Sequence, residues 1–296
     1  MSVAASRLSA EAAREAAALP PLLAQAERLA ASVWGVHGRR AAGAGETFWQ
    51  YRQAQPGDAA DQIDWRRSGR ADELYVRETE WETAQTVWVW PDDAASMRFS
   101  SAPKLPEKGE RAALLALALT MLLERGGERF AILGRGDRRV RRGRAGVNRA
   151  ALNLTKDRPT PGDYGAPPPA DFSRGARAAF LSDFFGDLDA LGEALRRAAA
   201  RQVRGVLMHV LDPVEEAFPY RGRVLFESLA GHLRYDADRA EALQDAYRAK
   251  LADRRAWLRD AARRAGWRVL THRTDAPAAP ALLALHGALQ HARIVR

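Results

Sequence analysis

The residues of this chain best suited to chemistry are acidic side chains that directly follow runs of apolar residues. Asp92 and Asp93 follow Thr86–Trp90, Asp183 follows Arg177–Leu181 with one serine between, and Asp212 follows Val203–Leu211. Carboxylate oxygens that converge at one edge of a sheet are suited to Mg²⁺, Mn²⁺ or Ca²⁺, because these hard cations prefer oxygen ligands. The competing interpretation is that each aspartate caps the helix that follows it. For Asp92 and Asp183 together, both interpretations stay open.

A second unusual stretch, Gln50–Arg70, concentrates charge around a Pro56-Gly57 turn and Trp65. Its cations are all arginine and its anions all aspartate: Arg52, Asp58, Asp61, Asp64, Arg66, Arg67 and Arg70. Because arginine and carboxylate form short bidentate pairs, one interpretation is an internal lattice that fixes the loop, with Trp65 packed beneath it. The pairs would join Asp58 and Asp64 to Arg52 and Arg66. The alternative is a docking face for carboxylates of a partner, with Arg67 and Arg70 as the best exposed contacts; we favour the lattice for Asp64 and Trp65.

Other kinds of active site find little support in the sequence. The chain contains no cysteine, which excludes disulfides, thiolate metal sites and cysteine nucleophiles. Its six histidines lack the spacing of metal ligands or of a catalytic triad, and no Lys-Ser/Thr phosphate loop occurs. We therefore expect a protein that is not an enzyme, and keep as an alternative a metal-dependent hydrolase that uses Asp92 and Asp183.

The order of the expected elements is that of an α/β protein. Continuous apolar runs, typical of parallel strands covered on both faces, lie at Thr86–Trp90, Phe130–Leu133, Arg177–Leu181, Val203–Leu211 and Arg268–Thr271. Helical patterns lie at Glu107–Arg125, Gly146–Leu154, Leu188–Arg201, Arg239–Ala265 and Pro280–Gln290. Phe218–Tyr235 is expected to form a hairpin. Strands that alternate with helices predict a doubly wound, mostly parallel sheet with helices on both faces.

The first 80 residues differ from the rest of the chain. Residues 1–33 have the pattern of two short helices broken at Pro20-Pro21, and residues 35–80 have the mixed composition of loops with short strands. We expect residues 1–80 to form a helical and loop extension that packs on a main domain of residues 81–296.

Composition limits the compartment and the partners. The longest apolar run is shorter than the roughly 20 residues of a transmembrane helix, and charged residues interrupt the N-terminus, so we expect a cytoplasmic protein without a transmembrane segment. The formal net charge is +9, from 46 Lys+Arg and 37 Asp+Glu. The basic segment Arg135–Arg144 predicts either a charged edge strand that blocks aggregation or a nucleic-acid-binding stripe. We favour the edge strand and keep nucleic-acid binding as the alternative function.

Taken together, these segments resemble a bacterial family called domain of unknown function 58. The matching pieces run in family order over residues 40–290, most of the chain, and the Pro56-Gly57-Asp58 to Ile63-Asp64-Trp65-Arg66 run is the most specific. The other pieces are Gly43–Phe48, Tyr51-Arg52, Arg70, Val76-Arg77-Glu78, Ser96-Met97, Ser182-Asp183-Phe184 and Leu211-Asp212-Pro213.

The resemblance implies a fold and a class of partner rather than a reaction. Members of the family look like von Willebrand factor A-type domains and are presumed to act as adaptors or chaperone-like partners of MoxR-type AAA+ ATPases. The resemblance thus implies a non-enzymatic protein-interaction module. Its expected partners are a MoxR-type ATPase and a membrane-anchored protein.

The same resemblance implies a divalent-cation site. The family's cation motif is Asp-x-Ser-x-Ser, and Asp92-Asp93-Ala94-Ala95-Ser96 keeps Asp92 and Ser96 but has Ala94 in place of the first serine. Asp183 would be the distal acidic group of this site. The expected cation is Mg²⁺, or else Mn²⁺ or Ca²⁺, held more weakly because Ala94 lacks a hydroxyl ligand.

Overall fold

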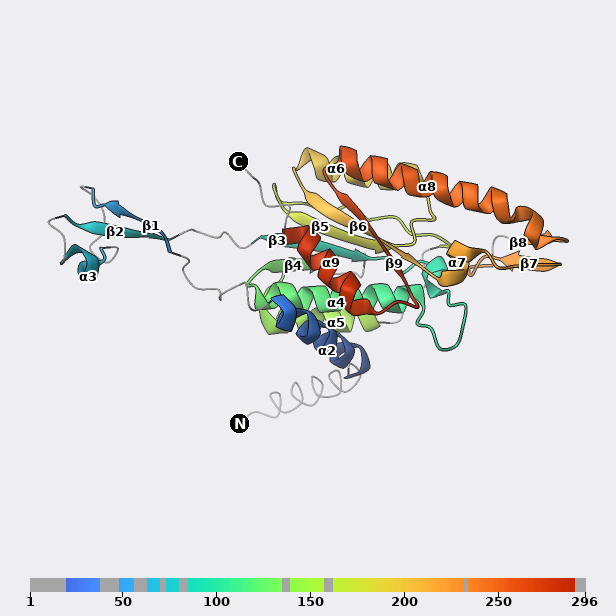
Figure 1. The fold of residues 1–296 in the computed structure, drawn as a ribbon, viewed down its shortest axis with the longest axis horizontal. Helices are drawn as coiled ribbons and strands as arrows, with labels where there is room; N and C mark the ends of the chain where they lie inside the picture. The colour runs from blue at the N-terminus through green and yellow to red at the C-terminus, as the bar shows by residue number, and fades with distance from the viewer. Residues whose placement is uncertain are drawn as a thin grey trace, which may run out of the picture. The chain divides into compact units, whose positions relative to one another are not determined.

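The structure, a computed structural model, describes residues 20–37, 48–55, 63–69, 73–79, 85–134, 139–156, 162–231 and 234–290. The chain divides into two compact units, one of residues 1–38 and 85–296 and one of residues 39–84. The first unit is a layered α/β structure, and the second holds a small two-stranded sheet with a short helix (Figure 1). In the described ranges, no helix combines the length and the apolar character that a membrane crossing requires.

A five-stranded sheet in the order β4-β3-β5-β6-β9 forms the centre of the first unit. Its strands are β3 (Thr86–Pro91), β4 (Arg129–Ile132), β5 (Arg177–Ser182), β6 (Arg204–Leu211) and β9 (Arg268–Arg273). Every neighbouring pair is parallel, which confirms the predicted mostly parallel sheet. Every residue of β3 and of β5 is buried, as expected for central strands that are covered on both faces.

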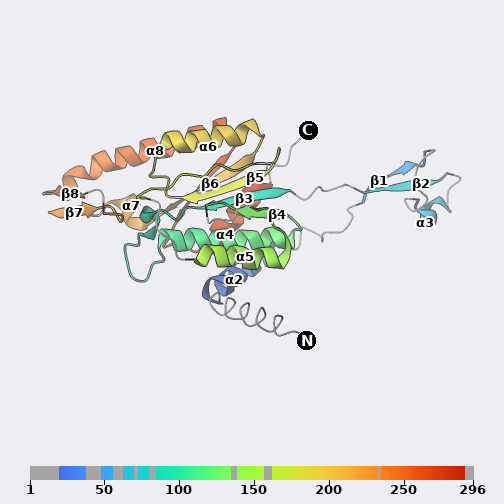
Figure 2. The same cartoon turned by 180° about the vertical axis from the view of Figure 1, so that it is seen from behind.

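Helices cover both faces of this sheet, so the fold is a doubly wound α/β structure (Figures 1 and 2). Val87 and Val89 of β3 belong to one apolar core, and Trp88 and Trp90 belong to the other, because successive side chains of a strand point to opposite faces. The helices on the valine face are α2 (Pro20–His37), α4 (Lys108–Arg125), α5 (Gly143–Thr155) and α9 (Ala278–Gln290). Those on the tryptophan face are α6 (Leu188–Ala200) and α8 (Gln244–Arg264).

The boundary between the units differs from the one expected at residue 80. The helix α2 belongs to the first unit, where Ala26, Ala30 and Val33 are buried in the core shared with α4 and α9. Small side chains at helical spacing let α2 lie close to its neighbours, so this helix is part of the main α/β layer. The separate unit begins only at residue 39 and ends at residue 84.

Short elements complete the first unit near the carboxyl ends of its strands. The 3₁₀ turn η2 (Ala95–Arg98) follows β3, and the short helix α7 (Pro213–Ala217) follows β6. The expected hairpin is confirmed as β7 (Val224–Glu227) paired antiparallel with β8 (Arg234–Ala237). The 3₁₀ turn η3 (Ala240–Leu243) precedes α8, so the helix expected from Arg239 begins at Gln244.

The second unit contains part of the charged stretch. Its strands β1 (Phe48–Gln53) and β2 (Tyr75–Thr79) pair antiparallel, and α3 (Trp65–Ser68) is a single helical turn between them. Val76 and Ser68 are buried, and the Ser68 hydroxyl accepts a hydrogen bond from the backbone N–H of Tyr75 at 2.9 Å. Asp58 and Arg70 lie outside the described residues.

Candidate functional site at the carboxyl edge of the sheet

The two aspartates that the sequence singles out lie at the same edge of the sheet. Asp92 directly follows β3 and Asp183 directly follows β5, and these strands are parallel neighbours. After β3 the chain runs outward to β4, and it then crosses back to add β5 on the other side of β3. The strand order therefore reverses between β3 and β5, and in doubly wound sheets such a reversal is where ligands bind.

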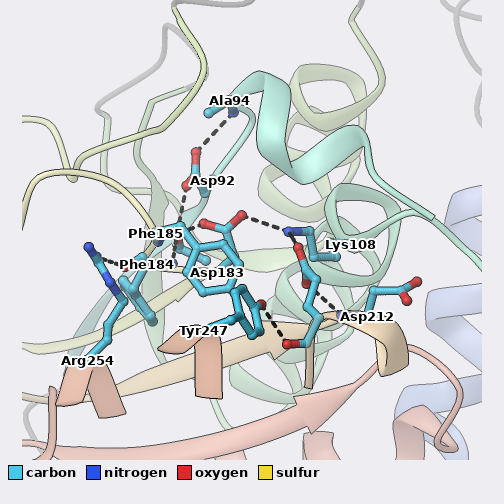
Figure 3. Close-up of polar contacts among 11 residues, drawn as sticks. Asp92, Ala94, Lys108, Asp183, Phe184, Phe185, Asp212, Tyr247 and Arg254 are labelled. Atoms are coloured by element: carbon cyan, nitrogen blue, oxygen red, sulfur yellow. Dashed lines mark hydrogen bonds and ion pairs between the residues drawn. The ribbon is translucent and has the colours of Figure 1, made fainter. Parts of the chain in front are cut away.

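Asp92 is a buried carboxyl held by two hydrogen bonds. Its Oδ1 accepts from the backbone N–H of Ala94 at 3.0 Å, and its Oδ2 accepts from the hydroxyl of Ser182 at 2.6 Å (Figure 3). Only 1% of the residue is exposed. Burial, and next the nearby charge of Asp183, raise the pKa of Asp92 to about 6, since both disfavour the ionised form.

Gly165 closes the loop over this carboxyl. A Cβ atom built on Gly165 would lie 2.0 Å from Oδ1 of Asp92, which is far inside van der Waals contact. The loop is also bonded to η2, because the N–H groups of Ala95 and Ser96 donate to the carbonyls of Gly162 and Asp163 at 3.0 and 2.8 Å. Only a residue without a side chain can bring the backbone so close to Asp92.

Gly165→Ala is therefore expected to lower the free energy of unfolding by about 1–3 kcal/mol, as overpacking in a filled core does. Urea unfolding followed by tryptophan fluorescence measures the change. Gly287→Ala in α9, where an added Cβ meets no atom within 4 Å, is the matched control and should not destabilise. Equal midpoints for Gly165→Ala and the parent chain would show that the loop is free to move away from Asp92.

Asp183 forms a buried ion pair with Lys108, the first residue of α4. The ammonium of Lys108 lies 2.8 Å from Oδ2 of Asp183 and 2.5 Å from Oε1 of Glu215 in α7 (Figure 3). Lys108 and Asp183 are each 1% exposed and Glu215 is 15% exposed. Burial alone would lower the pKa of Lys108, but the two carboxylates outweigh it and raise that pKa, so the ammonium stays charged.

Asp212, the aspartate that follows β6, stabilises the start of the helix α7. The Oδ1 atom of Asp212 accepts from the N–H of Val214 at 3.0 Å, and Oε2 of Glu215 accepts from the N–H of Asp212 at 2.9 Å, which makes a capping box at the start of α7. Oδ2 of Asp212 accepts from the N–H of Ser101 at 2.9 Å. The capping interpretation thus accounts for Oδ1 of Asp212, while Oδ2 binds the backbone of the loop that contains Ser101.

The helix α8 fixes the backbone around Asp183. Arg254 donates to the carbonyls of Phe184 and Gly186 at 2.5 and 2.9 Å, and Tyr247 donates to the carbonyl of Glu215 at 2.6 Å. Phe184 has a φ of 49°, a left-handed conformation that non-glycine residues adopt at a cost. These bonds hold the loop after β5 in a single arrangement, with its N–H groups turned toward Ser182 and Asp183.

The protein family follows from the sequence together with this architecture. The model of the family described as "Protein of unknown function DUF58" matches residues 50–257, a span that begins in β1, includes the strands β3, β4, β5 and β6 of the sheet, and ends in α8. The chain belongs to this family. The family predicted from the sequence is thereby confirmed, and no curated protein and no solved structure matches the chain.

At this edge of the sheet, the described residues of the DUF58 chain do not present an arrangement that fits a divalent cation. Ser96 offers one feature in favour, because its buried Oγ has no hydrogen-bond partner among the described residues. Against it, both oxygens of Asp92 already accept hydrogen bonds, Ala94 contributes no hydroxyl, and Asp183 is paired with an ammonium. In the part of the chain that the structure describes, no three His, Cys, Asp or Glu side chains form a group that could hold a metal.

Part of the charged stretch of the second unit lies among the described residues, and Asp64 begins its short helix. Oδ1 of Asp64 accepts hydrogen bonds from the backbone N–H groups of Arg66 and Arg67, at 3.1 and 3.0 Å, so Asp64 is the N-cap of α3. Trp65 is 61% exposed, and the prediction that it packs beneath the loop is wrong. On a four-residue helix only one side faces inward, and Ser68 occupies it.

The arginines of this stretch are placed in different ways. Arg52 lies in β1 opposite Val76. Arg66 and Arg67 are exposed, as predicted for Arg67, and the guanidinium of Arg67 lies 5.1 Å from the centre of the Tyr75 ring, within the range of a cation–π contact. These arginines belong to the second compact unit, whereas Asp92 and Asp183 belong to the first.

Sequence reasoning missed the residue at the centre of the site, Lys108. It stands at the start of an apolar helical pattern, where a lysine ordinarily points into solvent. The one signal was the Glu107-Lys108-Gly109-Glu110 run, whose two glutamates form the capping box that starts α4 and so fix where Lys108 points. The partners of Lys108 lie 75 and 107 residues further along the chain, a separation that spacing cannot reveal.

Proposed function

We propose that this protein is a non-enzymatic protein-binding module that docks its partner at the carboxyl edge of the sheet. The observation that carries the proposal is a group of exposed apolar side chains beside that edge. Seven large apolar side chains are exposed among the described residues. Four of them lie on the β7–β8 hairpin and on the loop over Asp92: Tyr164, Leu225, Leu229 and Tyr235. Apolar side chains gathered on one part of a surface commonly mark an interaction site.

The hairpin and the site are physically connected. Oδ1 of Asp163, in the loop over Asp92, accepts a hydrogen bond from the N–H of Ala230 at 2.9 Å, between β7 and β8. Phe218 stacks on Phe226 of β7 and on Tyr247 of α8, with ring centres 5.7 and 4.6 Å apart. A partner that contacts the hairpin would therefore press on the same loops that enclose Asp92 and Asp183.

Charge favours an acidic partner surface. The chain carries a net charge of +9. Four exposed arginines lie on or beside the hairpin: Arg221, Arg223, Arg234 and Arg239. Three of them also pair with carboxylates of the same region, Arg223 with Asp236, Arg234 with Glu227 and Arg239 with Glu241. We propose that the partner presents apolar side chains flanked by carboxylates. We further propose, on the basis of the family, that it is a MoxR-type AAA+ ATPase for which this protein is an adaptor, together with a membrane-anchored protein.

The two alternative functions have weaker support. Of the basic segment, Arg141 exchanges backbone hydrogen bonds of 2.9 and 2.7 Å with Phe130 of the edge strand β4, which favours the role of an edge guard over a nucleic-acid stripe. A metal-dependent hydrolase would need free carboxylates at the edge, whereas Asp92 and Asp183 are already bonded.

The double substitution Leu225→Asp with Leu229→Asp is expected to reduce capture of the AAA+ ATPase at least about tenfold, because it places charge within the apolar contact. The measurement is a pull-down from native lysate with and without ATP, in which mass spectrometry identifies the ATPase. Leu74→Asp, an exposed leucine of the other unit, is the control and should leave capture unchanged. Undiminished capture by the double variant, with its circular dichroism unchanged, would rule out docking at the hairpin.

A further inference from the structure

At the carboxyl edge of the sheet, the ammonium of Lys108 already serves as the cation that binds the acidic side chains. Oδ2 of Asp183 and Oε1 of Glu215 both bind the ammonium of Lys108. Their other oxygens, Oδ1 of Asp183 and Oε2 of Glu215, accept from the N–H groups of Phe185 and Asp212 at 3.0 and 2.9 Å. Each of the four carboxylate oxygens therefore has a donor, and a metal ion would have to displace one of them.

The ammonium is also fixed in place. Lys108 is 1% exposed, and its Nζ lies 5.2 Å from the centre of the Phe185 ring and 5.8 Å from that of the Phe99 ring. Its backbone is held by the capping box of α4, and the N–H of Lys108 donates to the carbonyl of Phe99 at 3.2 Å. A divalent cation in this space would lie beside the like charge of a buried ammonium, so electrostatics and packing both oppose its binding.

We infer that the ammonium of Lys108 takes the place of the divalent cation that the family motif implies, so that this edge of the sheet is organised without metal. Asp183 still binds a cation, but that cation is the ammonium of a lysine of the same chain instead of a metal ion. The carboxyl of Asp92 is bonded to Ser182 and lies close enough to Asp183 for the charges of the two carboxyl groups to repel each other. The inference concerns the site itself and does not depend on whether the hairpin docks a partner.

Removal of the Lys108 ammonium should create a site for a divalent cation. Lys108→Ala would vacate the space between Asp183 and Glu215, with the carboxyl of Asp92 still close to Asp183. Ser96, on the loop that follows Asp92, has a buried hydroxyl with no hydrogen-bond partner among the described residues. Carboxylate and hydroxyl oxygens are the ligands that Mn²⁺ and Mg²⁺ accept. The vacated site is therefore expected to gain affinity for a divalent cation that the parent chain lacks.

The test is a titration of the full chain with Mn²⁺ alone. Calorimetry and the loss of the electron paramagnetic resonance signal of free Mn²⁺ measure binding. Lys108→Ala should bind one Mn²⁺ at least about tenfold more tightly than the parent chain, and Mn²⁺ should raise its thermal midpoint. Adding Asp183→Asn to Lys108→Ala should abolish the gain. Lys104→Ala, which removes an exposed lysine of the same loop region, controls for the change in net charge and should not gain a site.

Measurements on the parent chain test the inference even if Lys108→Ala does not fold. Its thermal midpoint should be the same in EDTA as in Mn²⁺ or Mg²⁺, and it should show no stoichiometric Mn²⁺ site. A single Mn²⁺ site in the parent chain that disappears in Asp92→Asn would overturn the inference. So would a folded Lys108→Ala chain that binds Mn²⁺ no better than Lys104→Ala.

Discussion

Lys108→Met is expected to lower the free energy of unfolding by about 3–5 kcal/mol, the usual cost of breaking a buried ion pair from one side. Methionine retains most of the length of the lysine side chain but removes its charge. Asp183 and Glu215 would then face each other across an apolar side chain with no counter-ion, and Asp183 has no access to water. Urea unfolding measured by the fluorescence of the eight tryptophans reports the loss.

Two further variants separate the charge effect from packing. Lys156→Met, at an exposed lysine, should change stability by less than about 0.5 kcal/mol. Adding Asp183→Asn and Glu215→Gln to Lys108→Met should recover part of the loss, because the amide oxygens can still accept from Phe185 and Asp212 while the buried charges are gone. If Lys108→Met were as mild as Lys156→Met, the pair would contribute nothing to stability, and Lys108 would not be the organising cation of the site.

The sheet could be predicted because burial on both faces leaves a direct mark on sequence. In Thr86–Pro91 every side chain is buried, so the strand is apolar at successive positions and needs no partner to be recognised. Alternation with helices then determines that the strands are parallel, and parallel strands bring Asp92 and Asp183 to one edge. This much of the site follows from local pattern and connectivity.

The rest depended on contacts that local pattern does not encode. Trp65 was predicted to pack beneath a lattice of arginine and aspartate, but its single-turn helix buries only Ser68, and Trp65 is exposed. Lys108 was overlooked for the opposite reason, since a lysine becomes buried only where the fold supplies carboxylates. Those carboxylates come from the end of β5 and from α7, so the ion pairs exist only in the folded domain.

Acidification from pH 6.5 to 4 is expected to destabilise the protein steeply through two buried histidines. Burial, and next the charge of Arg255, lower the pKa of His209 to about 4; burial, and next Arg111, do the same for His272. Above pH 6.5 both rings are neutral in the folded and unfolded chains. Between pH 6.5 and 4 only the unfolded chain takes up the protons, so stability falls as the pH drops, by up to about 3 kcal/mol for the fully buried His209.

Asp92 acts in the opposite direction and supplies the control. Its pKa is raised to about 6 from 3.8, so the folded chain binds a proton between these values that the unfolded chain does not, and stability is gained there as the pH falls. His209→Leu should therefore flatten the decline of stability below pH 6.5, whereas Asp92→Asn should steepen it. Urea midpoints measured from pH 8 to pH 4 give both slopes. A decline that His209→Leu and His272→Leu together leave unchanged would mean that other groups cause the acid sensitivity.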